Sequence, residues 1–181
     1  MAKGWQKISS KIIHQNPWYR LREDDVIRPN GTEGKYFLVD GINSVAVIAE
    51  DSDERLYLVG QSRYPIGNLY SWEIITGGVK QGLDPLVIAK QELEEEAGVV
   101  AGKWTDLGYV YPINGYASER CSCFLAQKLT ITQAQHEDTE DISIRKENLD
   151  KIIEMIRNNK ITCGISIATV YKYLLYKNKF L

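Results

Sequence analysis

The sequence lacks any apolar run long enough to cross a membrane, and its first ten residues contain no apolar signal-peptide core. A membrane helix needs about 18 or more consecutive apolar residues. An excess of positive charge is also missing, since 22 Lys and Arg stand against 24 Asp and Glu, for a formal net charge of −2. This balance argues against general nucleic-acid binding. We therefore expect neither a membrane partner nor a nucleic-acid partner.

Cysteine and histidine are scarce, with only three and two residues in a chain of 181. A small, odd number of cysteines is typical of a reducing compartment, which predicts a cytoplasmic location. Cys121 and Cys123 are two residues apart in an apolar run that indicates a strand, so their side chains should share a face. We interpret them as buried or half-buried thiols, because a metal site would need further ligands nearby.

The remaining composition is that of an ordinary globular protein, with 44% apolar and 25% charged residues. At this length one domain is expected, and such a domain buries enough surface to be stable without disulfides. The sequence contains no internal repeat and no linker rich in proline or serine. We therefore predict a single domain over residues 1–181.

Strands are predicted where short apolar or alternating runs end at turn residues. Residues 18–27 and 35–39 should form a hairpin around the turn Pro29-Asn30-Gly31. The run VAVIA within 44–49 predicts a strand that is buried on both faces. Further strands are expected at 55–60, 70–75 (ending at Gly77-Gly78), 106–112 and 119–128.

A central helix is predicted between Asp84, a good N-cap followed by proline, and Gly98, a typical C-terminal stop. Its apolar stripe consists of Leu86, Ala89, Leu93 and Ala97. Two more amphipathic helices are expected at 146–157 and 165–176. Many strands with three helices predict an α/β fold in which helices cover a sheet.

The last turns of the central helix carry an unusual cluster of carboxylates. Glu92 and Glu96 are one turn apart and Glu95 lies beside them, so three carboxylates share one helix edge. Like charges at this spacing each cost about 0.2–0.5 kcal/mol. A solvated acidic surface is the ordinary interpretation. A divalent cation would remove the repulsion, and oxygen ligands suit Mg²⁺ or Mn²⁺.

The segment 76–83 precedes this helix and contains three glycines. We predict that it forms a sharply bent loop, because glycine adopts backbone conformations that other residues avoid. The lack of side chains also lets a substrate or a metal approach the backbone. A strand, a glycine loop and an acidic helix would then form one compact site.

Residues 77–99, GGVKQGLDPLVIAKQELEEEAGV, resemble the Nudix box, whose pattern is G-x5-E-x7-R-E-U-x-E-E-x-G-U with U a bulky aliphatic residue. The matching positions are Gly77, Glu92, Leu93, Glu95, Glu96, Gly98 and Val99. Residues 61–78 and 115–120 are similar to the ADP-ribose and nucleoside-diphosphate-sugar pyrophosphatase branch. The resemblance implies an α/β/α sandwich with a mixed sheet and an N-terminal β-hairpin arm. It also implies hydrolysis of a nucleoside diphosphate linked to another group.

The resemblance further implies a role for each box carboxylate. Glu92 and Glu96 would bind Mg²⁺, or alternatively Mn²⁺, together with the carbonyl oxygen of Thr76. Glu95 would be a further ligand or would orient the attacking water. Glu119 would be the general base, with a plain surface glutamate as the alternative.

Substrate contacts are implied outside the helix. Arg63 would contact a substrate phosphate, because a guanidinium presents paired donors that suit phosphate oxygens. Gly77 and Gly78 would lie beside the substrate. Tyr64, Tyr70 and Trp72 would line a base pocket or serve in packing. The acidic segment 137–141 is interpreted as a solvated loop.

Two positions depart from the Nudix pattern, with Leu83 at its first glutamate and Gln91 at its arginine. That arginine helps to orient the box carboxylates, and a neutral glutamine would do so more weakly. The leading hypothesis is hydrolysis of ADP-ribose or a nucleotide sugar to a nucleoside monophosphate and a sugar phosphate. The alternatives are an enzyme for dinucleoside polyphosphates and a weakened nucleotide-binding or regulatory module.

The resemblance also implies a homodimer. Residues 1–40 would be the dimerising β arm, and 41–181 the catalytic core. Trp18 and Tyr19 are expected in a core or at an interface.

Overall fold

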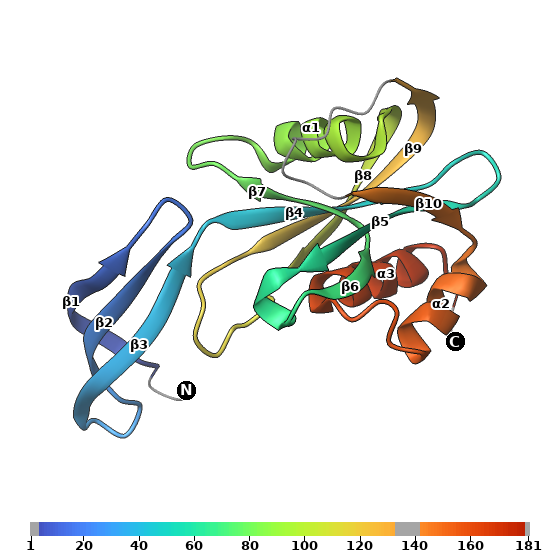
Figure 1. Cartoon of the computed structure of the whole chain (residues 1–181). Coiled ribbons are helices and arrows are strands. Elements are labelled where there is room, and N and C mark those ends of the chain that lie inside the picture. Colours follow the sequence, from blue (N-terminus) through green and yellow to red (C-terminus); the bar gives the residue numbers. More distant parts are fainter. Residues whose placement is uncertain (1–3, 133–141, 180–181) are drawn as a thin grey trace. The chain divides into compact units, whose positions relative to one another are not determined.

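The computed structural model describes residues 4–132 and 142–179, which form two compact units (Figure 1). The first unit consists of residues 4–42 and the segment Tyr111–Arg120. The second contains the rest of the described chain. The division of residues 1–181 into an arm at 1–40 and a core at 41–181 stays a prediction.

The first unit is built on an antiparallel three-stranded sheet in the order β1(Gln6–Gln15), β2(Tyr19–Ile27), β3(Glu33–Gly41). The predicted hairpin is confirmed as β2 and β3, and Gly31 in the turn has a φ of 87°. The strand β1 was not predicted. Its residues are exposed along its whole length and two register shifts interrupt its pairing with β2, so it shows no clean alternation.

The second unit contains a four-stranded mixed sheet. Its centre is β4(Asn43–Ala49), which pairs in parallel with β9(Cys121–Ile131) and antiparallel with β7(Ile75–Val79). The strand β8(Val99–Val110) completes the sheet on the other side of β9, in the order β7-β4-β9-β8. Both strand directions are present, which confirms the predicted mixed sheet.

A second sheet of this unit has β5(Leu56–Arg63) at its centre. It pairs antiparallel with β6(Leu69–Glu73) on one side and with β10(Ser143–Glu147) on the other. A short 3-10 turn, η1(Tyr64–Ile66), connects β5 and β6. Arg63 is the last residue of β5, and in this hairpin it lies opposite Leu69 at the start of β6.

Helices cover both faces of these sheets (Figure 1). Val45 and Val47 of β4 pack in a cluster with α1(Pro85–Ala97), whereas Ala46 and Ile48 pack in a second cluster with α2(Leu149–Arg157) and α3(Gly164–Tyr176). Residues 45–49 are completely buried, as predicted for a strand with two covered faces. The predicted α/β/α sandwich is therefore confirmed.

The caps of α1 agree with the prediction. The Asp84 carboxylate accepts a hydrogen bond from the Leu86 backbone N–H at 2.7 Å, which caps the first turn. Gly98 ends the helix in the left-handed conformation, and its N–H donates to the Glu94 carbonyl. The buried residues Ile88, Ala89, Leu93 and Ala97 face the sheet. This packing fixes the rotation of α1 and therefore the position of its glutamates relative to the sheet.

Several predicted boundaries were wrong around residues 70–78. The segment 70–75 belongs to two strands in different sheets, β6 and β7, with buried Ile74 between them. Gly77 and Gly78 continue β7 opposite Val45 and Ser44 rather than bending into a loop. Glycines in a strand mark close approach by another group, which local sequence does not reveal.

Other boundaries differ because tertiary pairing outweighs local pattern. The strand β8 begins at Val99 instead of residue 106, and β9 begins at Cys121 instead of residue 119. The polar strand β10 was missed, although it pairs with β5 over its whole length. The helix α2 consequently begins at Leu149 rather than residue 146, with the Asn148 side chain as its cap.

Side-chain placement confirms one prediction and corrects another. Cys121 and Cys123 are buried free thiols, as expected. Trp18 is 67% exposed and Tyr19 is also exposed, so neither belongs to a core of the described residues. The interface interpretation stays a prediction. None of the described helices has the length and apolarity needed to cross a membrane.

A buried carboxylate connects the end of β4 to α3. Glu50 is 3% exposed, and its Oε1 accepts a hydrogen bond from the Tyr173 hydroxyl at 2.7 Å. Lys177 Nζ lies 2.6 Å from the same oxygen, and Gln127 Nε2 donates to Oε2 at 2.5 Å. Burial, followed by this hydrogen bond and the negative charge, raises the pKa of Tyr173 far above its usual range. Tyr173 therefore remains a neutral donor.

We predict that Tyr173→Phe lowers the free energy of unfolding by about 1.5–3 kcal/mol, because it removes a donor to a buried charge. Urea denaturation measures the change. Tyr171→Phe on the exposed side of the same helix is the matched control and should have little effect. Equal midpoints for the two variants would contradict the role of this hydrogen bond.

Candidate active site

The carboxylates of α1 differ in burial, which separates them from a uniformly solvated surface. Glu92 and Glu96 are half-buried, whereas Glu94 and Glu95 are exposed. Leu93 is completely buried against the sheet and sets the rotation of the helix. The structure thus places the two glutamates predicted to bind metal at the edge where α1 meets the sheet.

Glu92 lies directly against the backbone of Gly77 in β7. A Cβ atom added to Gly77 would be 2.1 Å from both Cδ and Oε1 of Glu92. Any side chain at residue 77 would therefore occupy the place of the carboxylate. The glycine is required by this close approach rather than by a bend. Thr76, whose carbonyl oxygen was predicted to bind metal, precedes it in β7 opposite Ala46.

The donor set suits a hard divalent cation, because it consists of oxygen atoms only. The Oε2 atom of Glu96 is itself shielded from solvent. Within residues 4–132 and 142–179, no three His, Cys, Asp or Glu side chains already stand together as a metal-binding group. The structure therefore places one glutamate of the half-buried pair against Gly77. The ligand roles of Glu92, Glu96 and Thr76 stay predictions.

Arg63 at the end of β5 forms a bidentate ion pair with Glu73 at the end of β6. Its Nε donates to Oε1 at 2.9 Å and its Nη2 donates to Oε2 at 2.6 Å. These bonds raise the pKa of Arg63, although burial opposes them. Glu73 was not predicted. The signal was a charged residue within the apolar strand YSWEII, because a buried carboxylate requires a partner.

Comparison with protein families gives two adjacent matches. The model for the NUDIX domain matches residues 42–161, and the model for the nucleoside diphosphate sugar hydrolase N-terminal domain matches residues 5–39. The chain belongs to the Nudix family. Enzymes of this family generally need a divalent metal, which agrees with the all-oxygen donor set of the box helix.

Individual relatives align over most of their length. An ADP-ribose pyrophosphatase from Bacillus subtilis (strain 168) is 30% identical over 158 residues, which covers 86% of this chain and 82% of the relative. A methanol dehydrogenase activator from Bacillus methanolicus is 31% identical over 165 residues, covering 90% and 89%. A crystal structure of an ADP compounds hydrolase matches with a TM-score of 0.83 and 16% identity over 99% of both chains, which shows the fold.

The two departures from the Nudix box lie at exposed positions. Leu83 is 47% exposed in the turn before α1, and Gln91 is exposed on the helix. Neither position lies in the close contact between Glu92 and Gly77. Both substitutions therefore lie on exposed parts of the motif, away from that contact.

Glu119 belongs to the first unit, in a segment that is attached to β3. The Val39 backbone N–H donates to the Tyr116 carbonyl at 2.8 Å, and the Ser118 hydroxyl donates to Asp40 at 2.8 Å. Glu119 itself is half-buried. Its role as general base of the Nudix enzyme stays a prediction.

The aromatic residues near Arg63 have different environments. Trp72 packs against the cluster around α2 and carries the Arg145 guanidinium 4.9 Å from its ring centroid, which agrees with a packing role. Tyr64 is 85% exposed, so packing does not explain it. Tyr70 is partly exposed and its ring meets Trp72 edge to face, with the ring centroids 5.8 Å apart. The acidic segment 137–141 lies outside the described residues.

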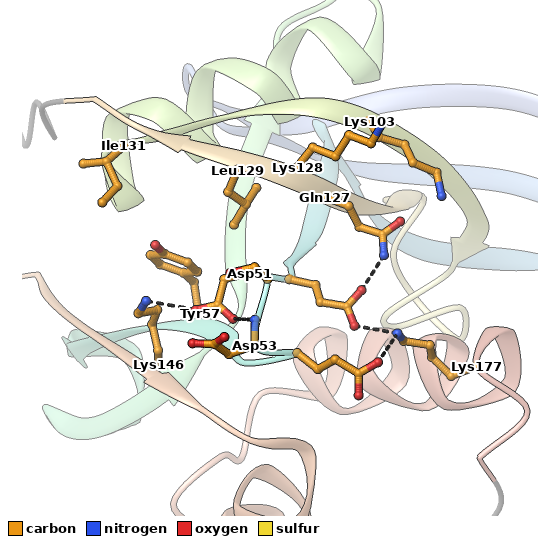
Figure 2. Close-up of a pocket in the computed structure, with 13 residues that line it drawn as sticks. Asp51, Asp53, Tyr57, Lys103, Gln127, Lys128, Leu129, Ile131, Lys146 and Lys177 are labelled. Atoms are coloured by element: carbon orange, nitrogen blue, oxygen red, sulfur yellow. Dashed lines mark hydrogen bonds and ion pairs between the residues drawn. The ribbon is translucent and has the colours of Figure 1, made fainter.

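A separate cavity of about 570 Å³ lies at the other end of β4 (Figure 2). Several of its charged residues form ion pairs with one another, such as Asp51 with Lys146 at 2.9 Å and Glu54 with Lys177 at 3.1 Å. It adjoins Glu50, whereas Gly77 pairs with Val45. We interpret this cavity as the open side of the charge cluster that connects β4 and α3.

We predict that Gly77→Ala leaves the fold intact and weakens Mn²⁺ binding by about tenfold or more, as displacement of a supporting contact does at metal sites. The added Cβ would meet the flexible end of Glu92, which can rotate away from the backbone. Thermal unfolding and Mn²⁺ titration measure the two effects.

Gly102→Ala in β8 is the matched control, because its Cβ would meet Lys128 at an ordinary 3.5 Å. Wild-type Mn²⁺ affinity in Gly77→Ala would show that Glu92 is not a ligand held by this contact.

Proposed function

We propose that this Nudix protein hydrolyses the pyrophosphate bond of ADP-ribose or of a nucleotide sugar. The products are a nucleoside monophosphate and a sugar phosphate. The observation that carries the proposal is the half-buried pair Glu92 and Glu96, with Glu92 seated against Gly77. The relative named ADP-ribose pyrophosphatase and the match to a nucleoside diphosphate sugar hydrolase N-terminal domain support the substrate class.

The proposed cofactor is Mg²⁺, with Mn²⁺ as a substitute. Glu92, Glu96 and the carbonyl oxygen of Thr76 would hold it. When bound, such a cation neutralises phosphate charge and lowers the pKa of a bound water. Glu95, which is exposed on the same helix, would orient the attacking water, and Glu119 would be the base that accepts its proton.

Substrate binding is assigned to the strands beside the box helix. The Arg63 guanidinium donates to a phosphate oxygen of the substrate, because it is planar and permanently charged. Gly77 and Gly78 in β7 let the diphosphate come close to the backbone. The substrate is therefore positioned from the sheet while the glutamates act from α1.

We predict that Glu96→Gln lowers metal-dependent hydrolysis by at least about 100-fold, which corresponds to about 2.7 kcal/mol of lost transition-state stabilisation. The fold should persist, and stability without metal should hold or rise by a few tenths of a kcal/mol, because one repulsive charge is removed. Product formation and thermal unfolding provide the two readouts.

Glu94→Gln, at an exposed glutamate of the same helix, is the control and should keep full turnover. The assignment fails if Glu96→Gln retains wild-type turnover on the best substrate.

The alternative is a nucleotide-binding or regulatory module without turnover. The departures at Leu83 and Gln91 favour it, and so does the relative named methanol dehydrogenase activator. A panel of ADP-ribose, nucleotide sugars and dinucleoside polyphosphates, assayed with excess Mg²⁺, separates the possibilities. Nucleotide binding without any product would favour the module, whereas preferred cleavage of a dinucleoside polyphosphate would change the substrate class.

The protein is further proposed to act as a cytoplasmic homodimer that associates through its N-terminal sheet. Free cysteines fit a reducing compartment. Large apolar side chains remain exposed on the sheet of the first unit, namely Trp5, Ile8, Ile12, Ile13, Trp18 and Phe37. So many exposed large apolar side chains in one small unit support association through it.

We predict that light scattering at micromolar concentration gives twice the 20.6 kDa mass of one chain. Phe37→Glu should shift the protein towards the monomer, because a charge in an apolar interface is costly. Ile131→Glu, at an exposed isoleucine of β9, is the control and should leave the mass unchanged. A monomeric wild-type protein would refute the dimer.

A further inference from the structure

Arg63 and Glu73 lie on the face of the β5–β6 pair that packs towards α1. Directly opposed residues of antiparallel strands share a face, and Glu73 is opposite Val59, which belongs to the hydrophobic cluster around α1. Arg63 is four residues beyond Val59 in the same strand and therefore shares its face. The ion pair is thus built on the side of the sheet that carries the box helix.

The geometry of this pair fixes the guanidinium in both position and plane. Glu73 is 4% exposed and accepts from Nε and Nη2 of Arg63 through its two oxygens. Two parallel bonds of this kind restrict the orientation of a guanidinium more than a single contact does. The Nη1 atom takes no part in these two bonds, so its donors can serve a third group.

Glu96 lies within electrostatic reach of this guanidinium. The pKa of Arg63 is raised first by its hydrogen bonds with Glu73 and, among weaker causes, by the negative charge of Glu96. The Nudix pattern has an arginine at residue 91, where this chain has an exposed, uncharged glutamine. Arg63 therefore brings positive charge towards Glu96 from the β5–β6 pair.

We propose that Glu73 is a positioning residue for the hydrolysis. Its buried carboxylate holds Arg63 so that the guanidinium supplies the positive charge that the box helix lacks at residue 91. Arg63 then offsets the mutual repulsion of the box glutamates and presents its remaining donors to a substrate phosphate. This inference rests on the proposed pyrophosphohydrolase function.

A double-mutant cycle tests the inference. Glu73→Gln keeps the shape of the side chain but removes its charge, and it should lower kcat/KM by about 10- to 100-fold, as misplacement of a substrate-positioning group does. Arg63→Ala should cause a similar loss. Because Glu73 acts through Arg63, the double variant should remain within about twofold of Arg63→Ala. Circular dichroism sets the amount of folded protein for each comparison.

Glu50→Gln is the matched control, because Glu50 is an equally buried and paired carboxylate at the other end of β4. It should lower the melting temperature and leave kcat/KM within about twofold of wild type. Glu73→Asp retains the charge with a shorter reach and should give an intermediate loss. It takes the place of Glu73→Gln if that variant does not fold.

The outcomes separate this inference from the function on which it rests. Wild-type kcat/KM in Glu73→Gln overturns the positioning role, and so does a double variant whose loss is the product of the two single losses. A loss that disappears after correction for folded protein overturns it as well. Wild-type protein without turnover on any nucleotide would overturn the proposed function and this inference together.

Discussion

The contact between α1 and β7 is the constraint on which the candidate site depends. Leu93 and Ala89 are completely buried, so the helix can dock on the sheet in only one rotation. That rotation brings the Glu92 carboxylate onto the backbone of Gly77, where a side chain would have to displace it. Apolar packing thereby holds two neighbouring negative charges at the sheet edge. Their repulsion is the feature that a divalent cation would relieve.

Three carboxylate sites in the second unit are buried or half-buried, and burial of a negative charge is costly unless it is compensated. Glu50 is neutralised by Lys177 and receives hydrogen bonds from uncharged donors, so it is a stabilising element. Glu73 is matched by a single arginine in a defined plane. Glu92 and Glu96 are half-buried and share one edge of α1. Glu50 and Glu73 therefore differ in the number and kind of groups that compensate a buried carboxylate.

Local signals were sufficient to predict the central helix α1 and the strand β4, which is buried on both faces. Asp84, Pro85 and Gly98 are specific for helix ends, and VAVIA is specific for a buried strand. The polar strands β1 and β10 escaped prediction because their order comes from pairing with distant residues. The same limitation applied to Gly77 and Gly78, whose place in β7 depends on the approach of a side chain from α1.

The candidate site was predictable to the extent that it lies within one continuous motif. Glu92 and Glu96 could be placed because a helix determines their spacing. Glu73 could not be paired with Arg63 in advance, since their contact depends on the register of the β5–β6 hairpin. The most direct measurement is an anomalous difference map from crystals grown with Mn²⁺ and a non-hydrolysable ADP-ribose analogue. We predict a Mn²⁺ peak bound by the carboxylates of Glu92 and Glu96 beside Gly77. A map with the analogue bound but no Mn²⁺ at these carboxylates would contradict the proposed site.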